Sequence, residues 1–373
     1  MTGIATPTLE AGRLVDEARL AAGAEPGEPL RFLDGLGVLT TALEEEARLS
    51  ERGRAGTRAA LLGALVTQLR VARAVKGRPP VARPRAVFIT GLLRTGTTFL
   101  HNLLAQHPDL RAPRLWELMS VADPRPPRER IRGCAAYVEE YYRAAPDFRA
   151  IHPLDPQLPE ECHRLTANSF RHFIYGLRYN VPSYMDWLDQ QPMAAAYHFH
   201  QLQLDCLLSA DPEPAAAVVL KCPSHLWHLD DLDRVYPGAT VIRLHRDPKV
   251  AIGSVCSLTA AVRSARSDDV SPSEIGAHWL DRAARALEAT HPGGAPIDVR
   301  YADLVADPLR VVAGVCERIG VPVTVAARDR MTRYLAAGAD KPATTHRYRL
   351  GDFGIDGDRL DRRLAAYRAA FDV

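Results

Sequence analysis

One short stretch strongly restricts the fold of this chain: AVFITGLLRTGTTFLHNLL, at residues 86–104. Its first residues form a continuous apolar run, which predicts a strand buried on both faces. A loop with two glycines follows, and apolar residues at helical spacing then resume. A strand, a tight loop and a helix in this order predict a unit whose loop and helix N-terminus bind an anion.

The loop departs from the usual nucleotide-binding pattern in one place. Gly91, Gly96 and Thr98 fit G-x-x-x-x-G-K-[ST], but Thr97 stands where the lysine belongs. Arg94 supplies positive charge from within the loop instead. We therefore expect the loop to hold an anionic group other than the end of a magnesium-bound triphosphate. A glycine turn with incidental threonines is the alternative interpretation.

Three further apolar runs predict strands, and helical patterns separate them. They lie at residues 216–221, 240–245 and 296–301. Strands that alternate with helices predict an α/β fold, a P-loop-like parallel sheet flanked by helices. Residues 1–80 read as an N-terminal helical region that ends in GRPPVARPR, because its prolines break a helix. Residues 81–373 then form the α/β domain, with a helical insertion at about 120–215.

Composition excludes several classes of function. A net charge of +2 gives no reason to expect nucleic acid as a partner. The six cysteines are scattered, without metal-ligand spacing, so we expect free thiols, no metal and a cytoplasmic location. The N-terminus lacks the apolar core of a signal peptide. Apolar runs of about 18 residues are missing, so no membrane span is expected.

A second candidate anion site follows the strand TVIRLH. Arg246 comes at the end of this strand, and Asp247 and Pro248 open a helix that carries Ser254. At 1.5 Å per residue, Ser254 lies about 9 Å along that helix. A guanidinium and a hydroxyl could then grip one phosphate at the carboxyl edge of the sheet. The alternative is a strand-end arginine paired with Asp247.

A third site follows the strand AAVVLK. Lys221 ends this strand and points toward the same edge of the sheet as Arg94 and Arg246. A lysine at the end of a buried strand is costly unless an anion meets it. His225 follows at the start of the next helix, where it could act as a base or simply pack in the core.

Together these motifs resemble the family of sulfotransferases that use 3′-phosphoadenosine 5′-phosphosulfate (PAPS), and in particular the bacterial branch similar to tyrosylprotein sulfotransferases. RTGTT matches the 5′-phosphosulfate loop [RK]-[ST]-G-T-T, and HPDLR follows it as in the family. Lys221-Cys222-Pro223 matches K-x-P, and Arg246 with Ser254 matches R-[DN]-P…S. YADLVADP resembles Y-E-x-L-x-x-x-P.

The resemblance implies roles for these residues. The 5′-phosphosulfate would be held by Arg94, Thr95, Gly96, Thr97 and Thr98, and the 3′-phosphate by Arg246 and Ser254. Phe99 and Tyr301 would contact the adenine, and Lys221 would stabilise charge on the transferring sulfuryl group. The C-terminal segment KPATTHRYRLGDFGID resembles the family's closing segment, with Lys341, Arg347 and Tyr348 as candidate nucleotide contacts.

The general base has two candidates. Tyrosylprotein-type relatives place a glutamate shortly after the HPD element, which implies Glu117. Cytosolic relatives use a histidine in a K-T-H motif, where this chain has Pro223 and the nearest histidine is His225. We expect Glu117, with His225 second. Because fixed arginines and lysine can stabilise the developing charge, no metal is required.

The expected acceptor is a hydroxyl of a small, lipophilic or phenolic molecule. Aromatic residues between 170 and 190 suggest a pocket for it in the helical insertion, although part of them could be core. Two other functions stay open. An ATP-dependent small-molecule kinase would want a lysine at Thr97 and an acidic residue at Arg246. A non-catalytic nucleotide-binding module would keep the anion loop and lack a base.

Overall fold

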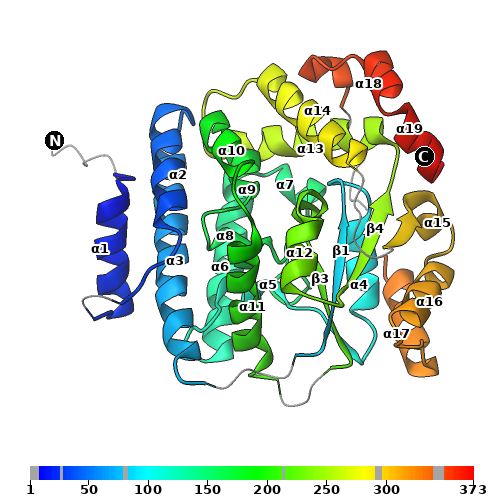
Figure 1. Ribbon diagram of the computed structural model, residues 1–373, viewed down its shortest axis with the longest axis horizontal. Helices are drawn as coiled ribbons and strands as arrows, with labels where there is room; N and C mark the ends of the chain where they lie inside the picture. Colours follow the sequence, from blue (N-terminus) through cyan, green and yellow to red (C-terminus); the bar gives the residue numbers. More distant parts are fainter. Residues whose placement is uncertain (1–7, 26–27, 79–82, 212–214, 290–295, 339–347) are drawn as a thin grey trace.

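The computed structural model describes residues 8–25, 28–78, 83–211, 215–289, 296–338 and 348–373. Its centre is a five-stranded parallel sheet in the order β2-β3-β1-β4-β5. The strands are β1 (Arg85–Gly91), β2 (Leu110–Arg111), β3 (Ala217–Lys221), β4 (Thr240–His245) and β5 (Ile297–Arg300). Helices flank this sheet (Figure 1), so the predicted α/β fold is confirmed.

Side chains of the central strand alternate between two hydrophobic cores. Phe88 packs into one core, and its neighbours Val87 and Ile89 pack into the other. On β3, Val218 and Val219 alternate in the same way. Both faces of the sheet are therefore buried, which explains why these strands are continuous apolar runs in the sequence.

Different sets of helices contribute to the two cores. On one side lie α4 (Thr97–Leu104), α15 (Tyr301–Ala306), α16 (Pro308–Arg318) and α17 (Val325–Ala336). The other core includes α11 (Ala194–Leu208), η1 (Pro223–Trp227), α12 (Leu229–Val235), α13 (Pro248–Ser264) and α14 (Pro272–Glu288). The C-terminal segment adds η2 (Leu350–Phe353), α18 (Gly357–Arg363) and α19 (Ala365–Phe371).

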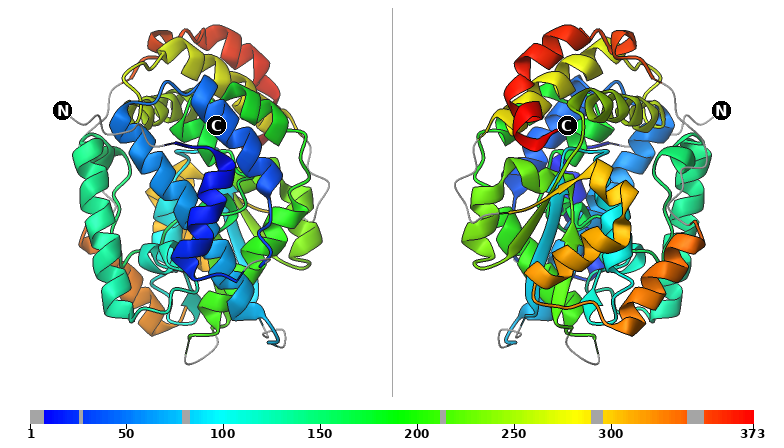
Figure 2. Two further views of the ribbon diagram at one scale, coloured as in Figure 1. Left: turned by 90° about the vertical axis from the view of Figure 1, so that its left-hand side faces the viewer. Right: turned by 90° about the vertical axis from the view of Figure 1, so that its right-hand side faces the viewer.

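The N-terminal helices share a core with the insertion helices. The N-terminal ones are α1 (Ala11–Ala22), α2 (Leu33–Glu45) and α3 (Glu51–Val75). Beside α11, the insertion forms α5 (Leu115–Met119), α6 (Pro127–Ala144), α7 (Phe148–Ile151), α8 (His163–Ala167), α9 (Ile174–Arg178) and α10 (Pro182–Leu188). Leu14, Leu36 and Leu61 belong to the same buried cluster as Tyr184. Figure 2 shows that α6 runs along one side of the molecule.

A repeated local signal starts three of the long helices. Asp247, Ser271 and Asp307 each precede a proline, and each side chain accepts a backbone N–H of the first helical turn. The proline fixes φ at a position where no helical hydrogen bond is lost. In α13 this signal fixes the direction in which the helix leaves the sheet edge, and thus the position of Ser254.

The structure differs from the sequence-based expectations at three points. β2 has only two residues, too few for a recognisable pattern. β4 ends at His245, so Arg246 is the first residue after the strand. His225 lies in the 3₁₀ turn η1 and not in an α-helix.

Two expectations from composition can be compared with the described residues. All six cysteines are free thiols. Within the described ranges, no helix combines the length and the apolar character needed to cross a membrane.

Candidate active site

The loop between β1 and α4 has a backbone that only glycine fits at two positions. Gly91 has a φ of 145°, and a Cβ there would lie 2.6 Å from the carbonyl oxygen of Leu244. Gly96 has a φ of 92°, and its Cβ would lie 2.6 Å from the Tyr301 ring. Arg94 also has a positive φ, 70°, which is uncommon for a residue with a side chain. The loop is thus wrapped closely around the N-terminus of α4.

Arg94 meets the second candidate site directly. Its Nε donates to Oγ of Ser254 at 3.2 Å, and Nη1 of Arg246 donates to the Arg94 carbonyl oxygen at 2.8 Å. The Arg246 guanidinium also lies 4.1 Å from the centroid of the Tyr301 ring. Arg94, Arg246, Ser254 and Tyr301, far apart in the sequence, therefore form one group at the carboxyl edge of the sheet.

The charge of this group is not balanced within the described part of the chain. Neither Arg94 nor Arg246 forms an ion pair with a described carboxylate, and Asp247 instead caps α13 through the Lys249 amide. Burial, followed by the neighbouring Arg246 guanidinium, lowers the pKa of Arg94. Arginine nonetheless keeps its proton in proteins. Two adjacent positive charges with no carboxylate partner favour an anion at this place.

Lys221 lies at the end of β3 and connects the loop to a carboxylate. Its ammonium donates to Oγ1 of Thr98 at 3.2 Å and to Oε1 of Glu161 at 2.8 Å. The Lys221 side chain is almost fully buried. Burial would lower the pKa of Lys221, but Glu161 and Glu160 raise it above its usual value. Lys221 is therefore a charged, buried cation beside the anion loop.

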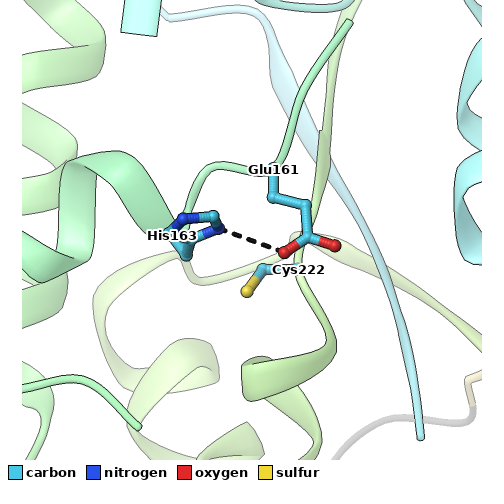
Figure 3. Close-up of side chains that lie close together, drawn as sticks. All are labelled: Glu161, His163 and Cys222. Atoms are coloured by element: carbon cyan, nitrogen blue, oxygen red, sulfur yellow. Dashed lines mark hydrogen bonds and ion pairs between the residues drawn. The ribbon is translucent and has the colours of Figure 1, made fainter. Parts of the chain in front are cut away.

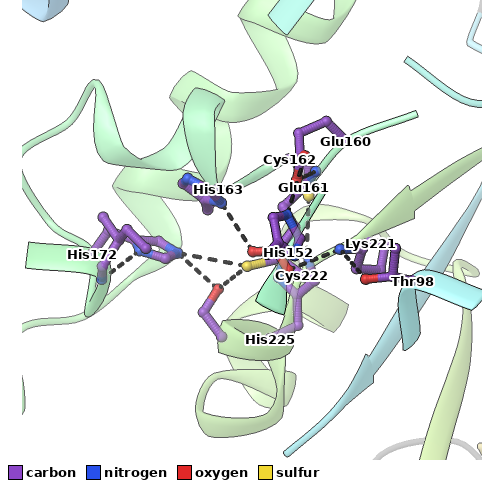
Figure 4. Close-up of polar contacts among 12 residues, drawn as sticks. Thr98, His152, Glu160, Glu161, Cys162, His163, His172, Lys221, Cys222 and His225 are labelled. Atoms are coloured by element: carbon purple, nitrogen blue, oxygen red, sulfur yellow. Dashed lines mark hydrogen bonds and ion pairs between the residues drawn. The ribbon is translucent and has the colours of Figure 1, made fainter. Parts of the chain in front are cut away.

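Histidines surround the two glutamates (Figure 4). Oε2 of Glu161 lies 3.1 Å from Nδ1 of His163, and Glu160 lies 3.3 Å from Nε2 of His152. Burial would raise the pKa of the Glu161 carboxyl, but Lys221 and His163 hold it well below its ordinary value. Burial lowers the pKa of His163 to about 4. At neutral pH Glu161 is thus ionised and His163 is neutral.

An inner cavity opens beside these polar residues. It has a volume of about 70 Å³, and Glu160, Glu161, His163 and Cys222 form part of its wall. The rest of the wall is mostly aromatic and aliphatic, including Tyr137, Tyr141, Phe148, Phe173, Ile174 and Leu177. The ion pair of Lys221 therefore lies between the anion loop on one side and an apolar cavity on the other.

The sequence of this chain matches the profile of a known protein family. The profile described as the sulfotransferase family matches residues 84–325, more than half of the chain. The chain belongs to the sulfotransferase family. The matched range includes the anion loop, Lys221, Arg246, Ser254 and Tyr301. Membership gives no support to the kinase alternative.

Solved structures of sulfotransferases show the same fold. The sulfotransferase STF1 from Mycobacterium tuberculosis is 32% identical, with a TM-score of 0.79, and the alignment covers 95% of this chain and 98% of that one. The sulfotransferase STF9 from Mycobacterium avium is similar in fold at 24% identity, with a TM-score of 0.84 and coverage of 100% and 98%. A search of curated proteins found no significant match.

The structure places Glu117 outside the group around Lys221. Both of its carboxylate oxygens accept hydrogen bonds from Arg111, at 2.7 and 3.0 Å, and one of them also caps the Arg114 amide. Arg111 in turn pairs with Asp211, at 3.0 Å. In this sulfotransferase-family chain Glu117 thus has a complete set of structural partners in its own helix and on β2.

His225, the second candidate base, lies in the core. It is fully buried, and its ring nitrogens contact Sγ of Cys162 at 3.2 Å and the Tyr197 hydroxyl at 2.9 Å. Its ring also packs edge-on against Phe88. Burial, followed by His200 and His228, holds the pKa of His225 well below its usual value. The structure does not bring His225 to the inner cavity.

Two of the remaining candidates, Phe99 and Tyr348, lie near the anion loop and Ser254. Phe99 is half-buried in the first turn of α4. Tyr348 packs against Gly253, next to Ser254, and its hydroxyl donates to the Val250 carbonyl at 2.8 Å. Lys341 and Arg347 lie outside the described residues.

Glu161, His163 and Cys222 form a compact group that metal ions sometimes use (Figure 3). Their ligand atoms all lie within 4.8 Å of one another. However, the Lys221 ammonium already occupies one Glu161 oxygen, and burial raises the pKa of the Cys222 thiol to about 12. Metal binding requires the thiolate. A divalent ion would also lie beside a buried ammonium, so the charges in this group disfavour a metal.

Sequence reasoning overlooked Glu161 and His163 as site residues. Both lie in the segment LPEECHRLTANSF, to which no site was assigned from the sequence. The available signal was a pair of consecutive glutamates directly before a helix. Acidic side chains are seldom buried unless they have a partner, so a buried pair indicates nearby cations or histidines.

Proposed function

We propose that this chain is a PAPS-dependent sulfotransferase that transfers the sulfuryl group to a hydroxyl of a small, lipophilic or phenolic acceptor. The observation that carries the proposal is the meeting of Arg94 and Arg246, joined by the 2.8 Å hydrogen bond from Arg246 to the Arg94 carbonyl, without a described carboxylate partner. A molecule with phosphate at one end and phosphosulfate at the other supplies the two missing anions.

Separate residues would hold the two ends of this donor. In the proposal Arg94 and the loop residues Thr95, Gly96, Thr97 and Thr98 bind the 5′-phosphosulfate at the N-terminus of α4. Arg246 and Ser254 bind the 3′-phosphate. Tyr301 and Phe99 border the adenine, and Arg347 remains a proposed contact from the C-terminal segment. Gly91 and Gly96 support this role indirectly, because they let the Leu244 carbonyl and the Tyr301 ring pack directly against the loop backbone and so fix its shape.

We assign the general base to Glu161 in place of Glu117. Glu161 lines the inner cavity and contacts Lys221, the residue proposed to stabilise the sulfuryl oxygens. In the transfer step the acceptor hydroxyl gives its proton to the Glu161 carboxylate, and its oxygen forms a bond to sulfur. The bond between sulfur and the phosphate oxygen breaks, and the electron pair leaves with 3′-phosphoadenosine 5′-phosphate (PAP).

The Lys221–Glu161 ion pair also explains how a carboxylate with a lowered pKa becomes a useful base. When the donor binds, its negative oxygens compete for the Lys221 ammonium. Glu161 then loses part of its counter-charge, and burial raises its pKa toward the range in which a general base works best. His163, neutral at physiological pH, keeps the carboxylate in position through its N–H.

The walls of the inner cavity support a lipophilic or phenolic acceptor. Tyr137, Phe148 and Phe173 offer apolar surface next to Glu161. Ligand sites of this kind combine apolar walls with a few placed polar groups.

The direct test is transfer of label. Purified protein is incubated with ³⁵S-labelled PAPS and a small-molecule cell extract, and products are separated and identified by mass. We expect a labelled organic sulfate together with PAP, and loss of the product with Lys221→Met. Release of free sulfate alone, or the same product from Lys221→Met, would refute the proposal.

A further inference from the structure

A second, larger groove lies behind the inner cavity. This outer groove has a volume of about 640 Å³ and runs between α3 and α6. The two spaces share five lining residues: Tyr137, Tyr141, His163, Arg164 and Arg178. These five residues therefore form a partition between the outer groove and the cavity that contains Glu161.

Small residues on α3 form the floor of the outer groove. Gly56, Ala60, Gly63 and Ala64 line it. A Cβ added at Gly56 or Gly63 would meet no atom within 4 Å. The space beside α3 is thus free of side chains, and an apolar chain could lie along it.

Three guanidiniums surround the partition. Arg164 lies over the Tyr137 ring at 5.8 Å, Arg266 lies over the Tyr141 ring at 5.2 Å, and Nη2 of Arg178 is 3.5 Å from Nε2 of His163. Burial would raise the pKa of the Tyr137 hydroxyl, but Arg164, Arg178 and Arg266 together bring it below its usual value. The three positive charges thus all lie along the partition and all act on Tyr137.

No carboxylate among the described residues forms an ion pair with any of the three. The acidic side chains that line the two spaces have other partners: Glu160 contacts His152, Glu161 pairs with Lys221, and Glu140 pairs with Arg52 at 3.0 Å. The Nε of Arg164 is buried and has no hydrogen-bond partner in the described part of the chain. Arg164 and Arg266 lie over tyrosine rings, and Nη1 of Arg266 donates to the Val262 carbonyl at 2.7 Å, but none of these neighbours carries a negative charge. A buried cation without a counter-charge is costly, and a bound oxyanion would supply that charge.

We infer that the acceptor is an amphipathic hydroxy acid, whose oxyanion binds at Arg164, Arg178 and Arg266, whose hydroxyl reaches Glu161, and whose apolar body lies in the inner cavity and outer groove. This inference rests on the proposed function and specifies the substrate class. One imidazole ring, that of His163, separates the two polar points, with contacts of 3.1 Å to Glu161 and 3.5 Å to Arg178. The arginines then select for charge, and Glu161 acts on the hydroxyl.

The test compares two probes of equal length on the PAP-loaded full chain. One is 3-hydroxydodecanoate, whose two polar groups are close together at one end, and the other is dodecane-1,3-diol, which replaces the carboxylate by a second hydroxyl. Affinities are measured by calorimetry. Because a hydrogen bond to a charged group is lost with the diol, we expect the carboxylate to bind about tenfold more tightly or better. Equal affinity for the two probes, or no binding of either, overturns the inference.

Two arginine variants test which residue is responsible for the preference for the carboxylate probe. Arg178→Gln should abolish the preference for the carboxylate and leave the affinity for the diol within about threefold of the original. Arg52→Gln is the matched control, because Arg52 lines the outer groove but is already paired with Glu140. It should keep the preference. If Arg178→Gln still prefers the carboxylate, or if this variant loses binding of both probes, the role assigned to Arg178 is contradicted.

Gly63→Leu tests the groove without touching a charged residue. The new side chain should lower the affinity for both probes by a similar factor and leave the affinity for PAP unchanged. Unchanged affinity for both probes would place the apolar body elsewhere. Failure of the unmodified chain to bind PAP would refute the proposed function itself, whereas equal probe affinities with normal PAP binding would refute only the acidic acceptor.

Discussion

The Lys221 ammonium and the Glu161 carboxylate form an ion pair of 2.8 Å at the point where the anion loop meets the inner cavity. This pair is buried, so its energy depends strongly on what else binds there. In the proposed mechanism an incoming donor contacts the Lys221 ammonium, and an incoming acceptor contacts the Glu161 carboxylate. Donor binding and proton transfer would then depend on different residues, and variants can separate the two.

Glu161→Gln should keep PAP binding and lower turnover by about 10²- to 10⁴-fold, because a general base contributes this much. Glu117→Gln is the matched control, since Glu117 bonds to Arg111 outside this group. It should lower stability more than turnover. Calorimetry with PAP and initial rates of transfer measure both effects. If the two variants lose turnover equally, or if Glu117→Gln loses more than Glu161→Gln, Glu161 is not the general base and Glu117 becomes the better candidate.

Gly96→Ala should weaken PAP binding, because the added Cβ would lie 2.6 Å from the Tyr301 ring. Gly238→Ala is the control: its φ of 78° is also left-handed, but a Cβ there meets no atom within 4 Å. Both variants should lose about 1–2 kcal/mol of stability through backbone strain. Only Gly96→Ala should change the Kd for PAP. A similar change of Kd in both variants would show that strain, not the contact with Tyr301, is responsible.

The free energy of unfolding should fall as the pH is lowered from 6.5 toward 4. Burial lowers the pKa of His101 and His200 to about 3 and that of His163 to about 4. In the unfolded chain these groups titrate near 6.5. The unfolded state therefore binds more protons below pH 6.5, and stability that is fully present above this pH is lost below it.

Each of these histidines adds a slope of up to about 1.4 kcal/mol per pH unit. Urea unfolding at several pH values measures the sum, and His200→Gln should reduce the slope. A stability that is flat or rises between pH 6.5 and 5 would contradict the assignment of neutral buried histidines.

Arg246→Ala should weaken PAP binding by about tenfold to more than a hundredfold, since hydrogen bonds to a charged group are lost. Arg243→Ala provides a control from β4, because Arg243 pairs with Asp298 at 2.8 Å and not with Arg94. Calorimetric titration with PAP compares the two. Comparable affinities for both variants would mean that the Arg246 guanidinium does not hold the 3′-phosphate.

The sheet and the donor side of the site follow closely from the sequence. Four of the five strands have at least four residues and were recognised from their apolar residues, and their order with the intervening helices implies a parallel sheet. The carboxyl ends of parallel strands meet at one edge. For this reason Lys221 and Arg246, placed at or just after the strand ends, come to the same edge as the loop.

The acceptor side could not be predicted in the same way. Glu161 reaches Lys221 from a loop before α8, and no periodic pattern indicates the path of such a loop. Glu117 and Glu161 are equally acidic in the sequence, and only tertiary contacts distinguish them: Arg111 takes one and Lys221 takes the other. His225 follows Lys221 closely along the chain, yet the turn η1 directs it into the core.

The central claim is that the group formed by Arg94 and Arg246 binds an adenosine with phosphates at both its 3′ and 5′ positions. The most direct measurement is a comparison of PAP with ATP and Mg²⁺ as stabilisers of the unmodified chain in thermal unfolding. At a ligand concentration a hundredfold above its Kd, PAP should add about 2.7 kcal/mol of stability, and ATP with Mg²⁺ should add little. Stabilisation by ATP with Mg²⁺ and none by PAP would contradict the account.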